Sequence, residues 1–468
     1  MSGDKFEFDM AVIGGGSGGY AAARTAAAAG LRTAVIEGGK EVGGLCILRG
    51  CMPTKALLYA AEVRHLALYA GLWGMKPAEV PFDWGAVMAR KDSLIKECAD
   101  DRVRQLGDGR FKFIRAQARF VDPHTVALSS GGTLSAAHFV ISTGSVVSPP
   151  PLPQLAAVGY ITSDDALTLR RAPKSLLVLG GGAVAVELAQ FFARFDVKVT
   201  LIQRGARLLK DLDEDAAAEV EKFSRREGIE LFTGTMLTDA WREGGNKGVT
   251  FVHEGKQKRV AVEEILFALG RSPNTASLAL AKAGVTDEKG RILANDRMQT
   301  SAPHIYAAGD CTGPFEVVHI AIQQGETAGH NIAHPDRPRR IDYRLLLHVV
   351  FTDPQVAAVG LTEKEARAHG VRYTAASYRF ADHGKSLIME ARDGFVKLLA
   401  DPGSGEILGG ACVGPVGGEL IHEIAAAMAR RMTVQELALM PHYHPTLAEI
   451  WTYPAEELAG KLDVKQGT

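Results

Sequence analysis

The chain has 468 residues, which is too long for one hydrophobic core and predicts two to four domains. Hydrophobic residues make up 46% and charged residues 23%, which excludes a disordered or fibrous chain. A formal net charge of -1 gives no general reason to bind nucleic acid or an anionic membrane. The polar, acidic start and the lack of a long uncharged apolar run predict a cytoplasmic chain without signal peptide or transmembrane helix.

The first predicted unit is strand, glycine turn, helix and strand. An apolar strand over residues 8–13 leads into Gly14, Gly16 and Gly19, which fit G-x-G-x-x-G, and the second strand ends in Glu37, 18 residues after the last glycine. Such glycines permit a tight turn and close approach of a pyrophosphate, which the N–H groups of the following helix bind. The acid accepts hydrogen bonds from a ribose, so this unit predicts a dinucleotide site.

Two cysteines follow at close spacing, Cys46 and Cys51, in GGLCILRGCMPTK. The other three, Cys98, Cys311 and Cys412, stand alone and are expected to be structural, because a lone cysteine is usually a small buried hydrophobe. A disulfide needs Cα atoms within about 7 Å, whereas five extended residues span about 17 Å, so the segment must coil. Helical neighbours are three or four residues apart, so we expect a distorted turn and a strained, reducible disulfide.

The residues after the pair favour thiol chemistry. Pro53 suits the first turn of a helix, and the helix N-terminus together with Lys55 would stabilise a thiolate. No second pair of Cys or His stands at ligand spacing, so no metal site is expected.

A Pro-rich stretch, SVVSPPPLPQL, predicts a linker to a second unit of the same pattern. In this unit Gly180 and Gly182 form the turn, and the second strand ends in Gln203 and Arg204 instead of an acid. Arginine attracts a 2′-phosphate that an acid would repel, which favours NADPH over NADH. The alternative is an ordinary solvated basic turn.

The remaining chain contains two further features. Asp310 ends a predicted strand at IYAAGD, where a carboxylate can bind a sugar-alcohol hydroxyl. From about Arg344 short strands alternate with helical runs and end in MPHYHPTLAEI, which predicts an α+β domain and a possible oligomer interface.

In chain order, GGGSGG, C-x-x-x-x-C-x-P-x-K, a second GGGxxxxE, GRSPN, YAAGD and HPTLAE resemble the class I FAD-dependent pyridine nucleotide–disulfide oxidoreductases. That family includes dihydrolipoamide dehydrogenase, glutathione reductase and mercuric reductase, and the resemblance covers essentially the whole chain. It implies an α/β fold with two Rossmann-like dinucleotide-binding domains, for FAD and NAD(P), and a C-terminal α+β dimerisation domain. The predicted boundaries are 1–150 for the first part of the FAD domain, 151–272 for the NAD(P) domain, 273–343 for the second, central part of the FAD domain and 344–468 for the dimerisation domain.

The resemblance also implies tight, non-covalent FAD binding by residues spread along the chain. They are Gly14, Gly16, Gly19, Glu37, Lys55, Ala118, Gly144, Asp310 and His319. Lys55 would lie near the flavin and pair with Glu187. The residues implied for NADPH or NADH are Gly180, Gly182, Arg204 and Gly270. Leu45 stands where the family usually has Thr, which removes a hydroxyl expected near the FAD phosphate.

Catalytic roles follow from the same resemblance. Cys51 would be the flavin-proximal thiol and Cys46 the interchange thiol that meets the substrate sulfur. His444 would move the proton, and Glu449 would orient it, as a carboxylate does in a hydrolase triad. In the family this His–Glu pair acts on the cysteines of the other subunit, so we expect a homodimer with shared active sites.

The substrate stays open between several disulfides or dithiols. HYHPTLAEI and His319 favour lipoamide, with a lipoyl-domain protein as one partner, whereas Gln203 and Arg204 resemble an NADPH-dependent glutathione-type reductase. Arg24 could mimic a contact to a glutathione carboxylate, but Thr25 lacks the second positive charge expected beside it. Mercuric reductase is a weaker alternative, because no cysteine follows Cys412. A non-catalytic flavoprotein binding module is the alternative from another class, and the Cys and His–Glu pairs argue against it.

Overall fold

The computed structural model describes residues 5–76, 79–313 and 315–462. The chain divides into two units. Unit 1 comprises Met1–Leu57, Asp83–Pro149 and Gly270–Asp342, and unit 2 comprises Leu58–Phe82, Pro150–Leu269 and Tyr343–Thr468. Within the described ranges, no helix combines the length and the apolar character needed to cross a membrane.

The central sheet of unit 1 is a mixed sheet with a parallel core. In sheet order its strands are β3 (Lys112–Arg115), β2 (Thr33–Glu37), β1 (Phe8–Ile13), β6 (Thr133–Ile141), β5 (Thr125–Leu128) and β4 (Ala118–Asp122), and β19 (Ile305–Ala307) pairs with β6. The first four strands and β19 are parallel, whereas β5 and β4 continue the sheet antiparallel. The apolar residues of β1 and β6 are almost fully buried, as expected of strands covered on both faces.

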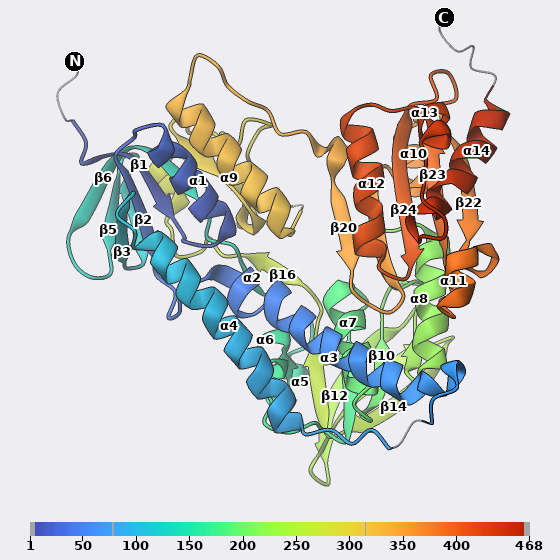
Figure 1. Cartoon of the computed structure of the whole chain (residues 1–468). Helices are drawn as coiled ribbons and strands as arrows, with labels where there is room; N and C mark the ends of the chain where they lie inside the picture. Colours follow the sequence, from blue (N-terminus) through green and yellow to red (C-terminus); the bar gives the residue numbers. More distant parts are fainter. Residues whose placement is uncertain (1–4, 77–78, 314, 463–468) are drawn as a thin grey trace, which may run out of the picture. The chain divides into compact units, whose positions relative to one another are not determined.

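Helices α1 (Ser17–Ala28) and α9 (Val318–Ala333) lie side by side against this sheet (Figure 1). Three glycines allow their backbones to touch. A Cβ on Gly18 would lie 2.9 Å from the carbonyl oxygen of Ala321, one on Gly325 2.1 Å from that of Gly18, and one on Gly329 2.6 Å from that of Ala22. The two helices therefore form one tightly joined pair.

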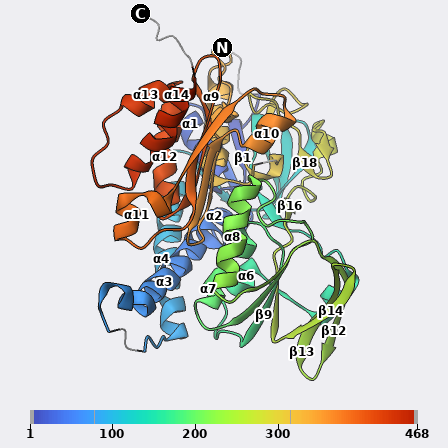
Figure 2. The ribbon, with the colours of Figure 1, turned by 90° about the vertical axis from the view of Figure 1, so that its right-hand side faces the viewer.

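Unit 2 contains a second parallel sheet. Its order is β11 (Glu230–Phe232), β10 (Lys198–Ile202), β9 (Ser175–Leu179), β15 (Glu264–Phe267) and β8 (Ile161–Thr162). The helices of this part are α5 (Pro153–Val158), α6 (Ser163–Ala166), α7 (Ala183–Ala193) and α8 (Glu214–Arg226). An antiparallel sheet of β12 (Met236–Glu243), β13 (Asn246–His253) and β14 (Lys256–Val262) lies next to β9 (Figure 2).

The C-terminal part of unit 2 is an antiparallel sheet with helices packed on it. The strand order is β20 (Leu347–Val350), β21 (Gln355–Gly360), β24 (Ile407–Gly414), β23 (Phe395–Ala400) and β22 (Thr374–Arg379). The helices are α10 (Glu363–Ala368), α11 (Gly384–Ile388), α12 (Gly417–Ala429), α13 (Val434–Leu439) and α14 (Thr452–Lys461). Trp451 is fully buried in their core, and its Nε1 donates to the Leu420 carbonyl oxygen at 3.1 Å.

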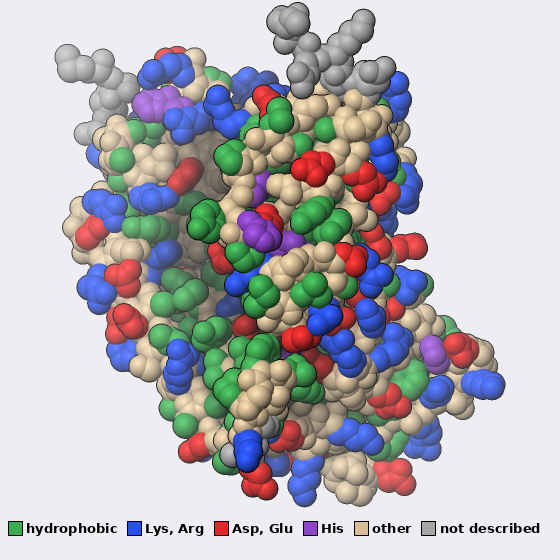
Figure 3. Space-filling model, turned by 45° about the vertical axis from the view of Figure 1, so that its right-hand side comes forward, with side chains coloured by type: hydrophobic (Ala, Val, Ile, Leu, Met, Phe, Trp, Pro, Cys, Tyr) green, Lys and Arg blue, Asp and Glu red, His purple; other side chains and the backbone are tan. Residues whose placement is uncertain are grey.

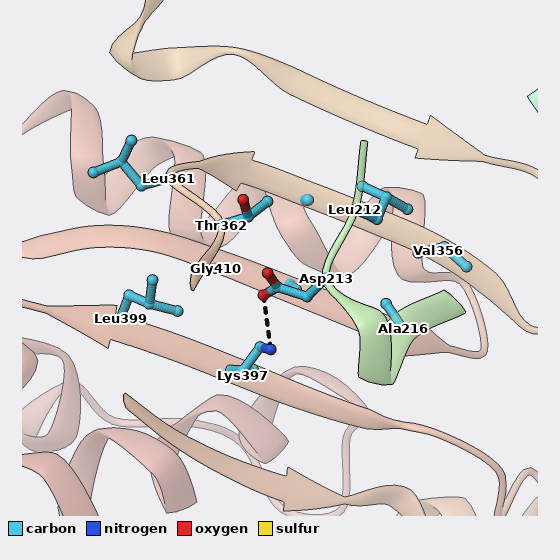
Figure 4. Close-up of a pocket in the computed structure, with 12 residues that line it drawn as sticks. Leu212, Asp213, Ala216, Val356, Leu361, Thr362, Lys397, Leu399 and Gly410 are labelled. Atoms are coloured by element: carbon cyan, nitrogen blue, oxygen red, sulfur yellow. Dashed lines mark ion pairs between the residues drawn. The ribbon is translucent and has the colours of Figure 1, made fainter. Parts of the chain in front are cut away.

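A buried ionic cluster joins the two parts of unit 2. The Nζ of Lys397 on β23 lies 2.8 Å from Asp213, 2.7 Å from Asp215 and 3.0 Å from Glu363, and its side chain is 4% exposed. Figure 4 shows Lys397 pointing across a small pocket to Asp213, beside Ala216 at the start of α8. Asp213 also accepts the backbone N–H of Glu363, at 3.2 Å. One cation thus ties β23 to the N-termini of α8 and α10.

Candidate active site

Cys46 and Cys51 lie on two consecutive helices of unit 1. Cys46 is in α2 (Gly44–Leu48), and Cys51 is the first residue of α3 (Cys51–Tyr69). Between them Gly50 approaches the preceding turn so closely that a Cβ would lie 3.0 Å from the Leu45 carbonyl oxygen and 3.3 Å from the Cys46 Cα. The helix is therefore interrupted between the two cysteines, as the spacing of five residues led us to expect.

Cys46 and Cys51 are both half-buried thiols, and a hydrogen bond joins their side chains. The hydrogen bond to Cys51 and, after it, burial raise the pKa of the Cys46 thiol, and the positive charge of Lys55 offsets a small part of this. Cys46 therefore holds its proton in this arrangement, and a base must remove that proton before Cys46 can attack a sulfur atom.

The cysteine segment begins directly against the first glycine turn. Gly44 has φ +71°, and a Cβ on it would lie 2.7 Å from the Cα of Gly16. A Cβ on Gly14 (φ +106°) would lie 2.2 Å from the Ser142 carbonyl oxygen, and one on Gly19 would lie 1.9 Å from that of Gly14. This part of unit 1 therefore depends on glycine, and it places a dinucleotide turn beside a pair of thiols.

The residues of this turn fit FAD. No described side chain caps the start of α1, so its first N–H groups are available to a pyrophosphate. The Oγ1 of Thr143 is buried without a hydrogen-bond partner among the described residues, as expected of a group that a ligand satisfies. Glu37 holds the turn, because its carboxylate accepts the N–H of Gly15 at 2.8 Å and of Gly39 at 2.6 Å.

The other predicted FAD residues all lie in unit 1. Asp310 begins a short 3-10 helix after β19 and accepts a hydrogen bond from Ser145 Oγ at 2.7 Å. Gly144 (φ +69°) follows β6, His319 is the second residue of α9, and Ala118 is buried at the start of β4. Their contacts to FAD stay predictions.

The second glycine turn, in unit 2, repeats the first with one change. Gly180 has φ +127°, and no described side chain caps the start of α7 at Gly182. Gln203 takes the place of the acid, since a Cβ on Gly181 would lie 2.8 Å from its amide carbon. Arg204 is exposed and forms no ion pair with the described residues, so its charge is available to a ligand.

Two further residues predicted for the nucleotide sites have a defined place. Gly270 (φ +116°) precedes β16 (Arg271–Pro273) in unit 1, and its carbonyl oxygen accepts the N–H of Ser148 at 3.1 Å. Glu187 is buried in α7 and accepts the N–H of Phe351 at 2.9 Å. The pairing of Glu187 with Lys55 stays a prediction, because the two residues belong to separately described units.

The C-terminal part of unit 2 brings His444 and Glu449 together. The Nδ1 of His444 lies 3.0 and 3.1 Å from the two carboxylate oxygens of Glu449, which fixes the ring and leaves Nε2 for a proton transfer. The Glu449 side chain is 9% exposed, whereas that of His444 is 76% exposed. The pair is thus a buried carboxylate that holds an imidazole out at the surface.

Sequence analysis did not identify a second histidine at this carboxylate. His383 is fully buried, its Nε2 lies 3.2 Å from Glu449 Oε1, and its Nδ1 lies 2.8 Å from Ser386 Oγ. Burial lowers the pKa of His383, so its ring is neutral. No motif or short spacing connects residue 383 with residue 449, so only the tertiary contact reveals it.

The surface around His444 is unusually apolar. The side chains of Leu439 and Tyr443 are 77% and 83% exposed. Figure 3 shows hydrophobic side chains gathered in patches next to histidines on one face of the molecule. Such a surface is typical of one that another protein surface covers.

Two family models match the chain. Residues 8–325 match the pyridine nucleotide-disulphide oxidoreductase model, and residues 347–455 match the dimerisation domain of pyridine nucleotide-disulphide oxidoreductases. The match to a dimerisation domain supports formation of a homodimer. Together with the two parallel sheets, it confirms the predicted α/β class with a C-terminal dimerisation domain.

Individual proteins are similar over nearly the whole chain. The dihydrolipoyl dehydrogenase of Thermus scotoductus is 37% identical, over 96% of this chain and 97% of that protein. The mercuric reductase of Streptomyces lividans is 34% identical, over 94% of each. The structure of the HOCl-induced flavoprotein disulfide reductase RclA from Escherichia coli aligns with a TM-score of 0.85 and 26% identity, over 96% of this chain and 99% of that one.

Proposed function

Because the chain belongs to the pyridine nucleotide–disulphide oxidoreductase family, as its motifs indicated, we propose that it transfers electron pairs between a nicotinamide nucleotide and a small disulfide or dithiol of the dihydrolipoamide type. The observation that carries the proposal is the contact of Gly44 with Gly16, which sets the Cys46–Cys51 pair against a dinucleotide turn. The dihydrolipoyl dehydrogenases among its relatives favour lipoamide as the substrate.

The enzyme uses FAD and a nicotinamide nucleotide, as its family membership shows. FAD, when bound, supplies the link between a two-electron hydride donor and a thiol pair. The first glycine turn, Glu37 and Asp310 are the residues that would hold FAD, and Gly180, Gly182 and Arg204 those that would hold the nicotinamide nucleotide. The exposed Arg204 and the uncharged Gln203 favour NADPH as the electron donor.

The chemistry of the two cysteines is a balanced exchange. In disulfide reduction the Cys46 thiolate attacks one substrate sulfur, the substrate S–S bond breaks, and the other substrate sulfur becomes a thiolate, which in a dithiolane stays tethered to the same molecule. The Cys51 thiolate then attacks the Cys46 sulfur, which forms the Cys46–Cys51 disulfide and releases the remaining substrate sulfur as a thiolate. The electron pair from the nicotinamide nucleotide restores both thiols.

His444 is the proton carrier in this scheme. It removes the Cys46 proton before attack and returns a proton to the leaving sulfur, while Glu449 keeps its Nδ1 occupied and its Nε2 outward. We assign this pair to the cysteines of the second subunit, because His444 stands exposed on an apolar surface that suits an interface. Each active site would then need both chains.

The test is spectroscopic and kinetic. The purified enzyme, reduced with NAD(P)H, should gain a long-wavelength charge-transfer band between the Cys51 thiolate and the flavin, and should turn over lipoamide faster than glutathione disulfide or mercuric ion. Cys51→Ser should lose the band, whereas the matched change of a lone thiol, Cys98→Ser, should keep it. A band that survives in Cys51→Ser refutes the assigned thiol pair, and a preference for another oxidant refutes the substrate.

A further inference from the structure

An arginine beside the cysteine segment lacks the carboxylate partner that its neighbours have. Arg102 lies near the end of α4 (Trp84–Leu106), the helix on which α2, with Cys46, packs in unit 1 (Figure 1). Its guanidinium lies over the ring of Tyr20, 4.3 Å from the ring centroid. Its Nε donates to Gln105 Oε1 at 3.2 Å, and its Nη1 is buried without a hydrogen-bond partner among the described residues.

The neighbouring arginines do have carboxylate partners, so acidic residues are present in this part of the structure. Arg24 pairs with Glu326, and Arg110 lies 2.6 Å from Asp108 and donates to the Tyr20 hydroxyl at 3.0 Å. The ion pairs of the described residues do not include Arg102. Arg102 as a whole is half-buried, but a buried N–H group without an acceptor is costly, and more so on a charged group, so the Nη1 suits a site where an anion binds.

The location distinguishes two possible anions, the pyrophosphate of FAD and an acidic group on the substrate. The FAD pyrophosphate already has the uncapped N-terminus of α1. Arg102 lies on α4, on which α2 packs with Cys46, the interchange thiol. Cys46 is the thiol that meets the substrate in the proposed function, on which this step rests.

We propose that Arg102, stacked on Tyr20, binds a carboxylate on the disulfide substrate, so that the enzyme accepts a dithiolane that bears a carboxylate as well as neutral lipoamide. The planar guanidinium can meet a carboxylate with two parallel N–H···O bonds, and the aromatic ring beneath holds it in that orientation. Arg110 also lies over this ring, 5.9 Å from the centroid, but its charge is paired with Asp108. The amide oxygen of lipoamide can accept an N–H bond from Arg102, but it carries no charge to balance the guanidinium.

Lipoic acid and lipoamide test this directly, because they share the dithiolane ring and differ in one carboxylate. We expect Arg102→Leu to lower kcat/KM for lipoic acid by about 10- to 100-fold, the effect of losing a hydrogen bond to a charged group, and to change that for lipoamide by less than about 3-fold. For Arg102→Lys, which keeps the charge, kcat/KM for lipoic acid should lie between the values of wild type and Arg102→Leu. Arg104→Leu is the matched control, since Arg104 is 68% exposed on the same helix and pairs with Asp101 at 3.0 Å. Arg104→Leu should leave kcat/KM unchanged for both lipoic acid and lipoamide.

Octanoate and octanamide give a readout that does not need turnover, through the perturbation of the flavin absorbance on binding. Octanoate should bind wild type at least about 10-fold more tightly than it binds Arg102→Leu, and octanamide should bind both alike. An equal loss for the acid and the amide, or no loss, overturns the proposal. So does loss of FAD from purified Arg102→Leu, which would assign the anion to the cofactor. A wild type that binds octanoate through Arg102 but turns over no disulfide would instead refute the proposed function.

Discussion

Replacing Lys397 by methionine should destabilise unit 2 strongly. The change keeps an unbranched side chain in β23 but removes the cation from three carboxylates at 2.7–3.0 Å, two of which, Asp213 and Glu363, are 10% and 21% exposed. Removing one partner of a buried ion pair costs about 3–5 kcal/mol. Asp213 keeps two backbone N–H bonds and Asp215 is 46% exposed, so we expect a value at the lower end, about 3 kcal/mol.

Chemical denaturation, followed by circular dichroism and by tryptophan fluorescence, measures this loss in the free energy of unfolding. Lys222→Met is the matched control, because Lys222 is 51% exposed and lies 3.0 Å from Glu219, a surface pair worth less than about 1 kcal/mol. Adding Asp213→Asn to Lys397→Met should restore part of the loss, since it removes one uncompensated charge. If Lys397→Met costs no more than Lys222→Met, the cluster does not stabilise the fold and the reasoning fails.

The same cluster predicts a pH dependence with a defined sign. Burial would raise the pKa of Asp213 and of Glu363, but the hydrogen bonds and the charge of Lys397, together with other hydrogen bonds, outweigh it and lower both. These other bonds come from backbone N–H groups at Asp213 and from the Tyr373 hydroxyl at Glu363. Their contribution to stability is therefore complete above the unfolded values of 3.8 and 4.5 and is lost as the pH falls below them. Lys397→Met should show a shallower loss of stability between about pH 5 and pH 3 than wild type.

Three further predictions concern the site. Burial lowers the pKa of His383, so the free energy of unfolding should fall as the pH drops below 6.5, the pKa of the unfolded state. In pH-dependent denaturation, His383→Asn should reduce the slope of this free energy against pH by about one proton, or about 1.4 kcal/mol per pH unit. An unchanged slope would show that His383 is not buried in its neutral form. Arg204→Leu should raise the KM for NADPH about 10-fold and leave that for NADH unchanged in stopped-flow reduction, and equal effects on both would exclude a 2′-phosphate contact. Mixing inactive Cys46→Ser and His444→Ala chains under subunit exchange should restore about a quarter of the wild-type activity, since half of the dimers carry one intact shared site; no recovery would count against sharing.

Local patterns predicted the nucleotide turns well, because a strand followed by closely spaced glycines leaves little conformational choice. The predicted strand 8–13 has the same bounds as β1, and the second predicted strand ends at Glu37, as β2 does. The distortion between Cys46 and Cys51 also follows from local geometry, since five residues do not match a helical repeat.

Contacts between distant segments could not be predicted in this way. His383 reaches Glu449 because β22 and the helices after β24 pack in one core, and Lys397 reaches Asp213 across more than 180 residues of chain. Arg102 is one of several arginines on a polar helix, and only the fold shows which of them is buried over an aromatic ring. Charge and spacing along the sequence do not carry that information.

The glycine contacts between α1 and α9 limit how this enzyme can be altered. Since Gly18, Gly325 and Gly329 let two backbones touch, even one methyl group there would wedge the helices apart and tilt the N-terminus of α1 away from the cofactor. Engineers who wish to change the substrate must therefore keep these three glycines, and on α4 also its buried residues Trp84, Met88, Lys91 and Leu106. A library that mutates Gly18, Gly325 and Gly329 should yield folded proteins without the yellow colour of FAD, because a displaced α1 would no longer hold the flavin nucleotide.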